Sequence, residues 1–154
     1  MPFKILSITL FLLSFLFKMN AQNIEITDFK EYELNNVSIR AIEIVNDSIL
    51  WFAGNNGKFG RIKNNSIELD STQKINSGKL HFRSIAFNGE FLFLLSIENP
   101  AILLRLNPFG KEIGKPIIVY EEQHEKVFYD SMKFFDKKNG IAMGDPTDIC
   151  LSII

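Results

Sequence analysis

The sequence predicts an all-β protein made of repeated units of four short antiparallel strands. Three stretches share one pattern of apolar strands and turn residues: Ile39–Ile62, Phe82–Leu106 and Tyr129–Ile153. Superimposing Ala41, Ser84 and Ser131 gives spacings of 43 and 47 residues. A period of about 40–50 residues with several strands per unit is typical of the blades of a β-propeller. We therefore expect about two and a half blades, in repeats at 37–70, 80–120 and 127–154.

The first repeat contains four segments of alternating or β-branched residues, as expected for strands. These segments are Ile39–Val45, Ile49–Ala53, Lys58–Ile62 and Ser66–Leu69. Turn-forming residues separate them at Asn46-Asp47, Gly54–Gly57 and Asn64-Asn65. Four strands joined by short turns make one blade.

The second repeat shows the same succession. Its expected strands are Phe82–Phe87, Phe91–Ser96, Ile102–Leu106 and Pro116–Tyr120. Asn88-Gly89 predicts a two-residue hairpin, because both residues tolerate a positive φ. Glu121–Lys126 is interpreted either as one turn of helix or as a solvated loop.

The third repeat is shorter than the other two. Ser131–Phe135 and Ile141–Met143 predict two strands, and Cys150–Ile154 begins a third. Because each blade of a propeller packs both faces against neighbours, two and a half blades leave apolar faces and a strand edge open. We therefore expect this chain to be the N-terminal part of a longer propeller. This part would not function alone.

Residues 1–21 have the pattern of a secretory signal peptide. Lys4 precedes the 13-residue apolar run Ile5–Phe17, and Ala21 offers a cleavage site before Gln22. The sequence thus predicts an exported protein, periplasmic or extracellular, with no stable membrane span after cleavage. Lys18 leaves open the alternative of an uncleaved N-terminal anchor. In either case, the part of the propeller present in this chain would occupy residues 22–154.

The charge balance argues against a nucleic-acid-binding protein. The chain has 17 basic and 18 acidic residues and a formal net charge of −1. Nucleic-acid recognition requires a basic face, and this composition does not supply one. A protein or peptide is the expected kind of partner.

Several short segments resemble those of one propeller family. The segments are similar to parts of secreted propellers related to the photosystem II assembly and stability factor; they are Phe82–Ile85, Gly140–Pro146 and Trp51–Gly57. These propellers in turn resemble sortilin-type and neuraminidase-repeat propellers. The resemblance implies a propeller fold and carries the oxidoreductase label often given to this family. The chain lacks the family's T-x-D-G-G-x-x-W turn after Arg61 and after Arg105.

Arg40, Arg83 and Asp130 occupy equivalent places in the three repeats, before the first strand's alternating residues. The first strand of a blade is the innermost, so these residues are expected at the mouth of the central channel. Two arginines beside an aspartate could bind a carboxylate or a peptide terminus with paired hydrogen bonds. Alternatively, they tie neighbouring blades together by ion pairs.

Other reactive residues lie in no pattern that predicts catalysis, a cofactor or a metal. Cys150 is the only cysteine, and His81 and His124 have no ligand spacing. Asp145 and Asp148 are too few for a calcium site and fit a turn. The sequence favours a non-catalytic binding or assembly module over the alternative, part of an exported propeller enzyme of glycosidase-like or oxidoreductase type.

Overall fold

A computed structural model describes residues 29–72, 80–97 and 99–146. The predicted signal peptide at 1–21, Asp148 and the predicted strand Cys150–Ile154 lie outside these residues. The chain divides into two units, Met1–Glu33 and Leu34–Ile154, and every described strand belongs to the second. No helix within the described ranges is long and apolar enough to cross a membrane.

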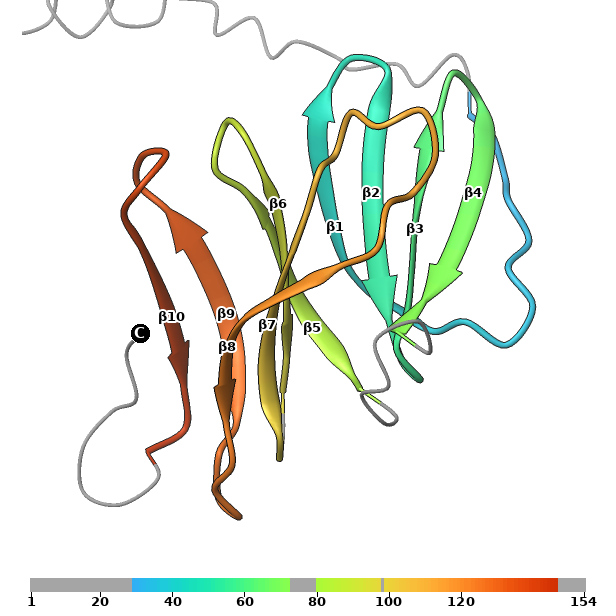
Figure 1. Cartoon of the computed structure of the whole chain (residues 1–154). Helices are drawn as coiled ribbons and strands as arrows, with labels where there is room; N and C mark the ends of the chain where they lie inside the picture. Colours follow the sequence, from blue (N-terminus) through green and yellow to red (C-terminus); the bar gives the residue numbers. More distant parts are fainter. Residues whose placement is uncertain (1–28, 73–79, 98, 147–154) are drawn as a thin grey trace, which may run out of the picture. The chain divides into compact units, whose positions relative to one another are not determined.

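The described residues of the second unit form three antiparallel sheets that follow one another along the chain, and we call them blades 1, 2 and 3 (Figure 1). Blade 1 consists of β1 (Ile39–Asn46), β2 (Ile49–Gly54), β3 (Lys58–Lys63) and β4 (Ser66–Ser71). Blade 2 consists of β5 (Phe82–Phe87), β6 (Leu92–Ser96), β7 (Ala101–Leu106) and β8 (Ile117–Glu122). In blade 3 the structure describes β9 (Tyr129–Phe134) and β10 (Gly140–Gly144). The predicted succession of four-stranded antiparallel blades is confirmed.

One local prediction needs correction, and one pair of alternatives is decided. The connection after β5 is not a two-residue hairpin, because four residues separate Phe87 from Leu92. The side-chain oxygen of Asn88 accepts hydrogen bonds from the backbone N–H groups of Glu90 and Phe91, and this Asx turn lengthens the loop. At the other end of blade 2, β8 continues through Glu122, so the residues that follow form a loop and not a helix.

Two apolar cores hold the blades together. Between blades 1 and 2, aromatic residues of β2 and β3 meet the leucines of β6 and β7, and Trp51, Phe59, Leu94 and Leu104 are all fully buried. The second core, between blades 2 and 3, is smaller and includes Leu95, Ala101, Val127, Tyr129 and Met132. Both cores use faces of blade 2, which explains why β6 is buried along most of its length.

The first strands of the three blades are neighbours, since β1 contacts β5 and β5 contacts β9 (Figure 1). Polar contacts reinforce this arrangement. Glu43 accepts a hydrogen bond from the backbone N–H of Phe87, and the hydroxyl of Ser84 accepts one from the N–H of Met132. The first strand of each blade is therefore bonded to the first strand of the next.

Candidate binding site on the inner strands

Each of the first strands has an irregular register at the same place. The pairing of β1 with β2 shifts between Ile39 and Ala41, and that of β5 with β6 shifts between Phe82 and Ser84. In blade 3, Gly144 pairs with Tyr129 and Met143 with Ser131. The residues passed over are those that the sequence singles out: Arg40, Arg83 and Asp130. We call these three residues the bulge row.

The backbone around each bulge follows one pattern in all three blades. The carbonyl oxygens of Ser38, His81 and Phe128, which precede the strands, accept hydrogen bonds from the N–H groups that follow the second strands. These donors are Asn55, Ile97 and Asp145, at 3.2, 3.0 and 2.9 Å respectively. A bulge redirects the side chain that it leaves unpaired. The repeated geometry therefore presents one side chain per blade at the same end of the inner strands.

Two glycines allow this close approach of the backbone. A Cβ atom on Gly54 would collide with the carbonyl oxygen of Ser38, and one on Gly144 would collide with that of Phe128. Gly54 is the last residue of β2 and lies within Trp51–Gly57, and Gly144 is the last residue of β10 and lies within Gly140–Pro146. The physical reason for glycine in both segments is the bulge beside it.

Arg83 and Asp130 form an ion pair between blades 2 and 3. Nη1 of Arg83 lies 3.2 Å from Oδ1 of Asp130, and their side chains are 47% and 46% exposed. The guanidinium also lies 5.7 Å from the centre of the Phe128 ring. Because a guanidinium has five N–H donors, the ion pair leaves Arg83 able to bind a further acceptor. Arg40 is exposed on β1.

A second polar cluster, which sequence reasoning missed, joins β8 to β9. One carboxylate oxygen of Glu122 accepts hydrogen bonds from the hydroxyls of Tyr120, at 2.9 Å, and Tyr129, at 2.8 Å. Burial, and then the bond to Glu122, raises the pKa of Tyr129 far above its ordinary value near 10, so the phenol stays protonated. The cluster therefore acts as a structural link and not as a source of phenolate. The sequence offered one signal of this cluster: Tyr129 occupies in the third repeat the place that Phe82 occupies in the second.

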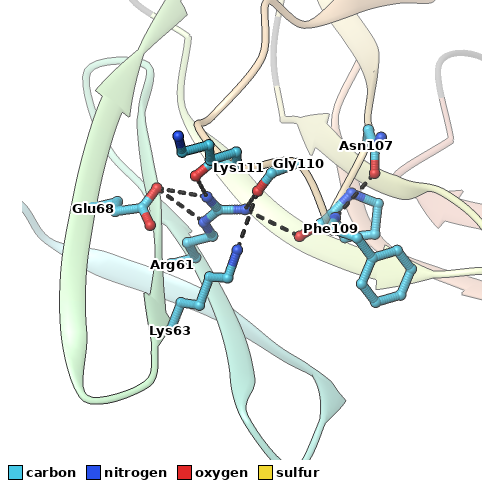
Figure 2. A network of polar contacts seen from close by, with 8 residues as sticks. Arg61, Lys63, Glu68, Asn107, Phe109, Gly110 and Lys111 are labelled. Atoms are coloured by element: carbon cyan, nitrogen blue, oxygen red, sulfur yellow. Dashed lines mark hydrogen bonds and ion pairs between the residues drawn. The ribbon is translucent and has the colours of Figure 1, made fainter.

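A third cluster surrounds the buried Arg61 (Figure 2). The guanidinium binds Glu68 through Nη2 at 2.7 Å and through Nε at 3.0 Å. It also donates to the backbone carbonyls of Pro108, Gly110 and Lys111, which belong to the loop after β7. These contacts fasten blade 1 to blade 2. All of the guanidinium's nitrogens have acceptors, so this cluster offers no free binding capacity.

Acidic and metal-ligating side chains do not gather into a site within the described residues. Within the described part of the chain, no group of three or more His, Cys, Asp or Glu residues could hold a metal ion. The carboxylate of Glu122 accepts hydrogen bonds from two tyrosine hydroxyls, whereas the side chains of Glu121 and Glu125 are exposed to solvent. Among the clusters described, the bulge row alone combines exposed charges with a position repeated in every blade.

One of three comparisons with known proteins bears on the fold. Neither the protein-family models nor the curated proteins give a match. Among solved structures, the chain is similar to the WD40 beta propeller domain of Doa1, with a TM-score of 0.52 and 14% sequence identity. The similarity covers 73% of this chain and 36% of that chain, so this chain spans about a third of the length of the propeller it matches. The chain thus has a β-propeller fold, as the repeat length predicts.

Proposed function

We propose that this chain is an exported, non-catalytic binding module that captures a protein or peptide partner at the bulge row. The supporting observation is that, in each of the three described first strands, the residue passed over by the register shift near the start of the strand is charged. Arg40, Arg83 and Asp130 bring two positive charges and one negative charge to the same end of three neighbouring strands. Their side chains reach solvent, whereas the charged cluster around Arg61 is buried.

The chemistry of the row favours a carboxylate as the group recognised. Arginine presents paired N–H donors that match the two oxygens of a carboxylate, and such charge-assisted bonds are the stronger kind. Asp130 holds Arg83 from one side at 3.2 Å, which orients the guanidinium before a ligand arrives. The free C-terminus of an extended peptide has the size and charge to bind at the remaining donors.

Export and family relationship are part of the same proposal. The run Ile5–Phe17 and the small residue Ala21 support secretion, and the turns Trp51–Gly57 and Gly140–Pro146 support a relation to propellers of the photosystem II assembly factor type. Mass spectrometry of the protein from its native host is expected to find Gln22 as the first residue. Finding Met1 on a membrane-bound protein would contradict export with cleavage.

The binding proposal is tested with a peptide library in which each sequence carries either a free C-terminal carboxylate or an amide. Fluorescence anisotropy with the full chain is expected to show binding of the free acids only. Arg83→Gln removes one charged donor group and is expected to weaken binding about tenfold, in line with the strength of hydrogen bonds to charged groups.

Arg105→Gln is the matched control, because Arg105 stacks on Phe91 at 4.7 Å and lies outside the row. It is expected to bind as the unaltered protein does. Equal binding of acids and amides, or an equal loss in Arg83→Gln and Arg105→Gln, would show that the row is not the site.

A further inference from the structure

The face of blade 1 that points away from blade 2 carries exposed apolar side chains. On β1, Ile42 is 61% exposed and Ile44 is 67% exposed. Glu43, between them, pairs with Trp51, which belongs to the core shared with blade 2. Since side chains alternate along a strand, Ile42 and Ile44 point to the opposite face, which we call the free face of blade 1. Apolar side chains gathered on an exposed face indicate an interaction surface.

The repeat shows what covers the equivalent face in the other blades. The register shifts of the first strands align Ile42 and Ile44 with Ile85 and Phe87 of blade 2. Ile85 is buried in the core between blades 1 and 2, and Phe87 packs against it. The corresponding residues of blade 3 likewise pack against blade 2; they are Met132 and Phe134. The free face of blade 1 therefore has the positions that, in blades 2 and 3, receive the preceding blade.

Blade 3 presents the face that would complement it. In blade 1, the face turned toward the following blade carries Trp51 and Ala53 of β2, and both are fully buried there. The strand pairing places Ile141 and Met143 of β10 at the same positions in blade 3. Met143 is 45% exposed. The described part of blade 3 thus offers apolar side chains at the positions that cover a following blade.

The charges of the bulge row also fit a contact between blade 3 and blade 1. Within the chain, Arg83 of blade 2 pairs with Asp130 of the blade that follows it. If blade 1 of another copy followed blade 3 in the same way, Asp130 would lie beside Arg40 of that copy. Both side chains are exposed, so both can reach a partner. Opposite charges across an interface fix its register and favour the correct partner.

One polar contact between blades can recur there and one cannot. The hydroxyl of Ser84 accepts a hydrogen bond from the backbone N–H of Met132, and Ser131 takes the position of Ser84 in blade 3. Glu43 accepts a hydrogen bond from the backbone of blade 2, but Lys133 takes its position in blade 3 and has no acceptor. A contact between blade 3 and blade 1 is therefore expected to be weaker than the contact between blades 1 and 2.

We propose that copies of the chain associate head to tail, with blade 3 of one copy packed on the free face of blade 1 of the next. The contact continues the series that blades 1, 2 and 3 already form. It is heterologous, because the two copies contribute different faces, so each copy can bind two others. We therefore expect assemblies larger than a dimer that dissociate on dilution. The proposal does not rest on the ligand proposed for the bulge row, because packing of the two faces needs no peptide.

Sedimentation velocity of the full chain at about 100 μM tests the proposal. The unaltered chain is expected to form oligomers larger than a dimer. Ile44→Lys alters the free face of blade 1, and Met143→Lys alters the face of blade 3. Each variant alone is expected to weaken association about a hundredfold, because the contact would bury an unpaired ammonium group.

A mixture of the two variants separates head-to-tail packing from other kinds of association. Ile44→Lys keeps the face of blade 3 intact, and Met143→Lys keeps the free face of blade 1 intact. One copy of each can therefore form a single unaltered contact. An equimolar mixture is expected to form dimers and to stop at that size, because the two remaining faces both carry a lysine.

Ile117→Lys is the matched control, because Ile117 is 54% exposed and lies on β8 of blade 2, which supplies neither face. It is expected to associate as the unaltered chain does. Circular dichroism checks that each variant keeps its strand content. A monomeric unaltered chain would overturn the proposal. So would a mixture that stays monomeric, or a loss of association in Ile117→Lys equal to that in Ile44→Lys.

Discussion

At the scale of single residues, the position of a charge determines what it does. Arg61 is fully buried and satisfied by one carboxylate and three carbonyls, so it holds two blades together. Arg83 is half exposed and shares one carboxylate, so it can still bind a ligand. Both are arginines on strands, and their different roles follow from burial and from the number of acceptors nearby.

The buried arginine leads to a stability prediction. Arg61→Ala leaves Glu68 and the carbonyls of the loop after β7 without their donor. Glu68 is 34% exposed and can be hydrated again, whereas a buried carbonyl left without a donor costs about 1–3 kcal/mol of unfolding free energy. Lys63→Ala is the control, because Lys63 is partly exposed and makes a single 3.3 Å bond to Gly110. Its expected cost is below about 1 kcal/mol. Urea denaturation measures both, and equal costs would contradict a special role for Arg61.

At the scale of elements, turn geometry is set by which residue can adopt a positive φ. Asn64 and Asn65 alone join β3 to β4, and their φ values are 49° and 65°. A two-residue hairpin needs a positive φ at both residues so that the turn matches the right-handed twist of the strands. Asn88-Gly89 has the more familiar hairpin sequence, yet only Gly89 has a positive φ there. The side chain of Asn88 binds two backbone N–H groups of its own loop, and this local bonding competes with the tighter turn.

At the scale of the whole second unit, blades 1 and 2 are expected to unfold together. Their shared core unites Trp51 and Phe59 of blade 1 with Phe82, Leu94 and Leu104 of blade 2. Trp51 is the only tryptophan, and it lies in the shared core, so its fluorescence reports on blade 1 and on its packing against blade 2. Removing packing from one side of this core should therefore destabilise both blades.

Leu94→Ala is the variant that tests this coupling. A buried leucine-to-alanine change costs about 2–5 kcal/mol, and the substitution lies in blade 2. The transition seen by Trp51 fluorescence is expected to move to lower urea concentration and to coincide with that seen by circular dichroism. A Trp51 transition that stays unchanged while the circular dichroism shifts would show that the blades are independent units.

Local patterns in the sequence were sufficient to predict most of the strands, their order and the repeat. The alternation of apolar residues and the preferences of turn residues act over a few residues. Strands such as Ile39–Val45 and Phe82–Phe87 can therefore be predicted without knowing the rest of the fold. The same repeat placed Arg40, Arg83 and Asp130 at equivalent positions, which the register shifts of the inner strands explain.

The contacts between residues of different blades could not be predicted from the sequence. Arg61 is 47 to 50 residues from the carbonyls that it binds, and Tyr129 finds Glu122 on another strand. The pairing of Arg83 with Asp130 likewise depends on how β5 and β9 lie side by side. Such contacts depend on how the sheets pack and twist against one another, and no local pattern in the chain carries that information.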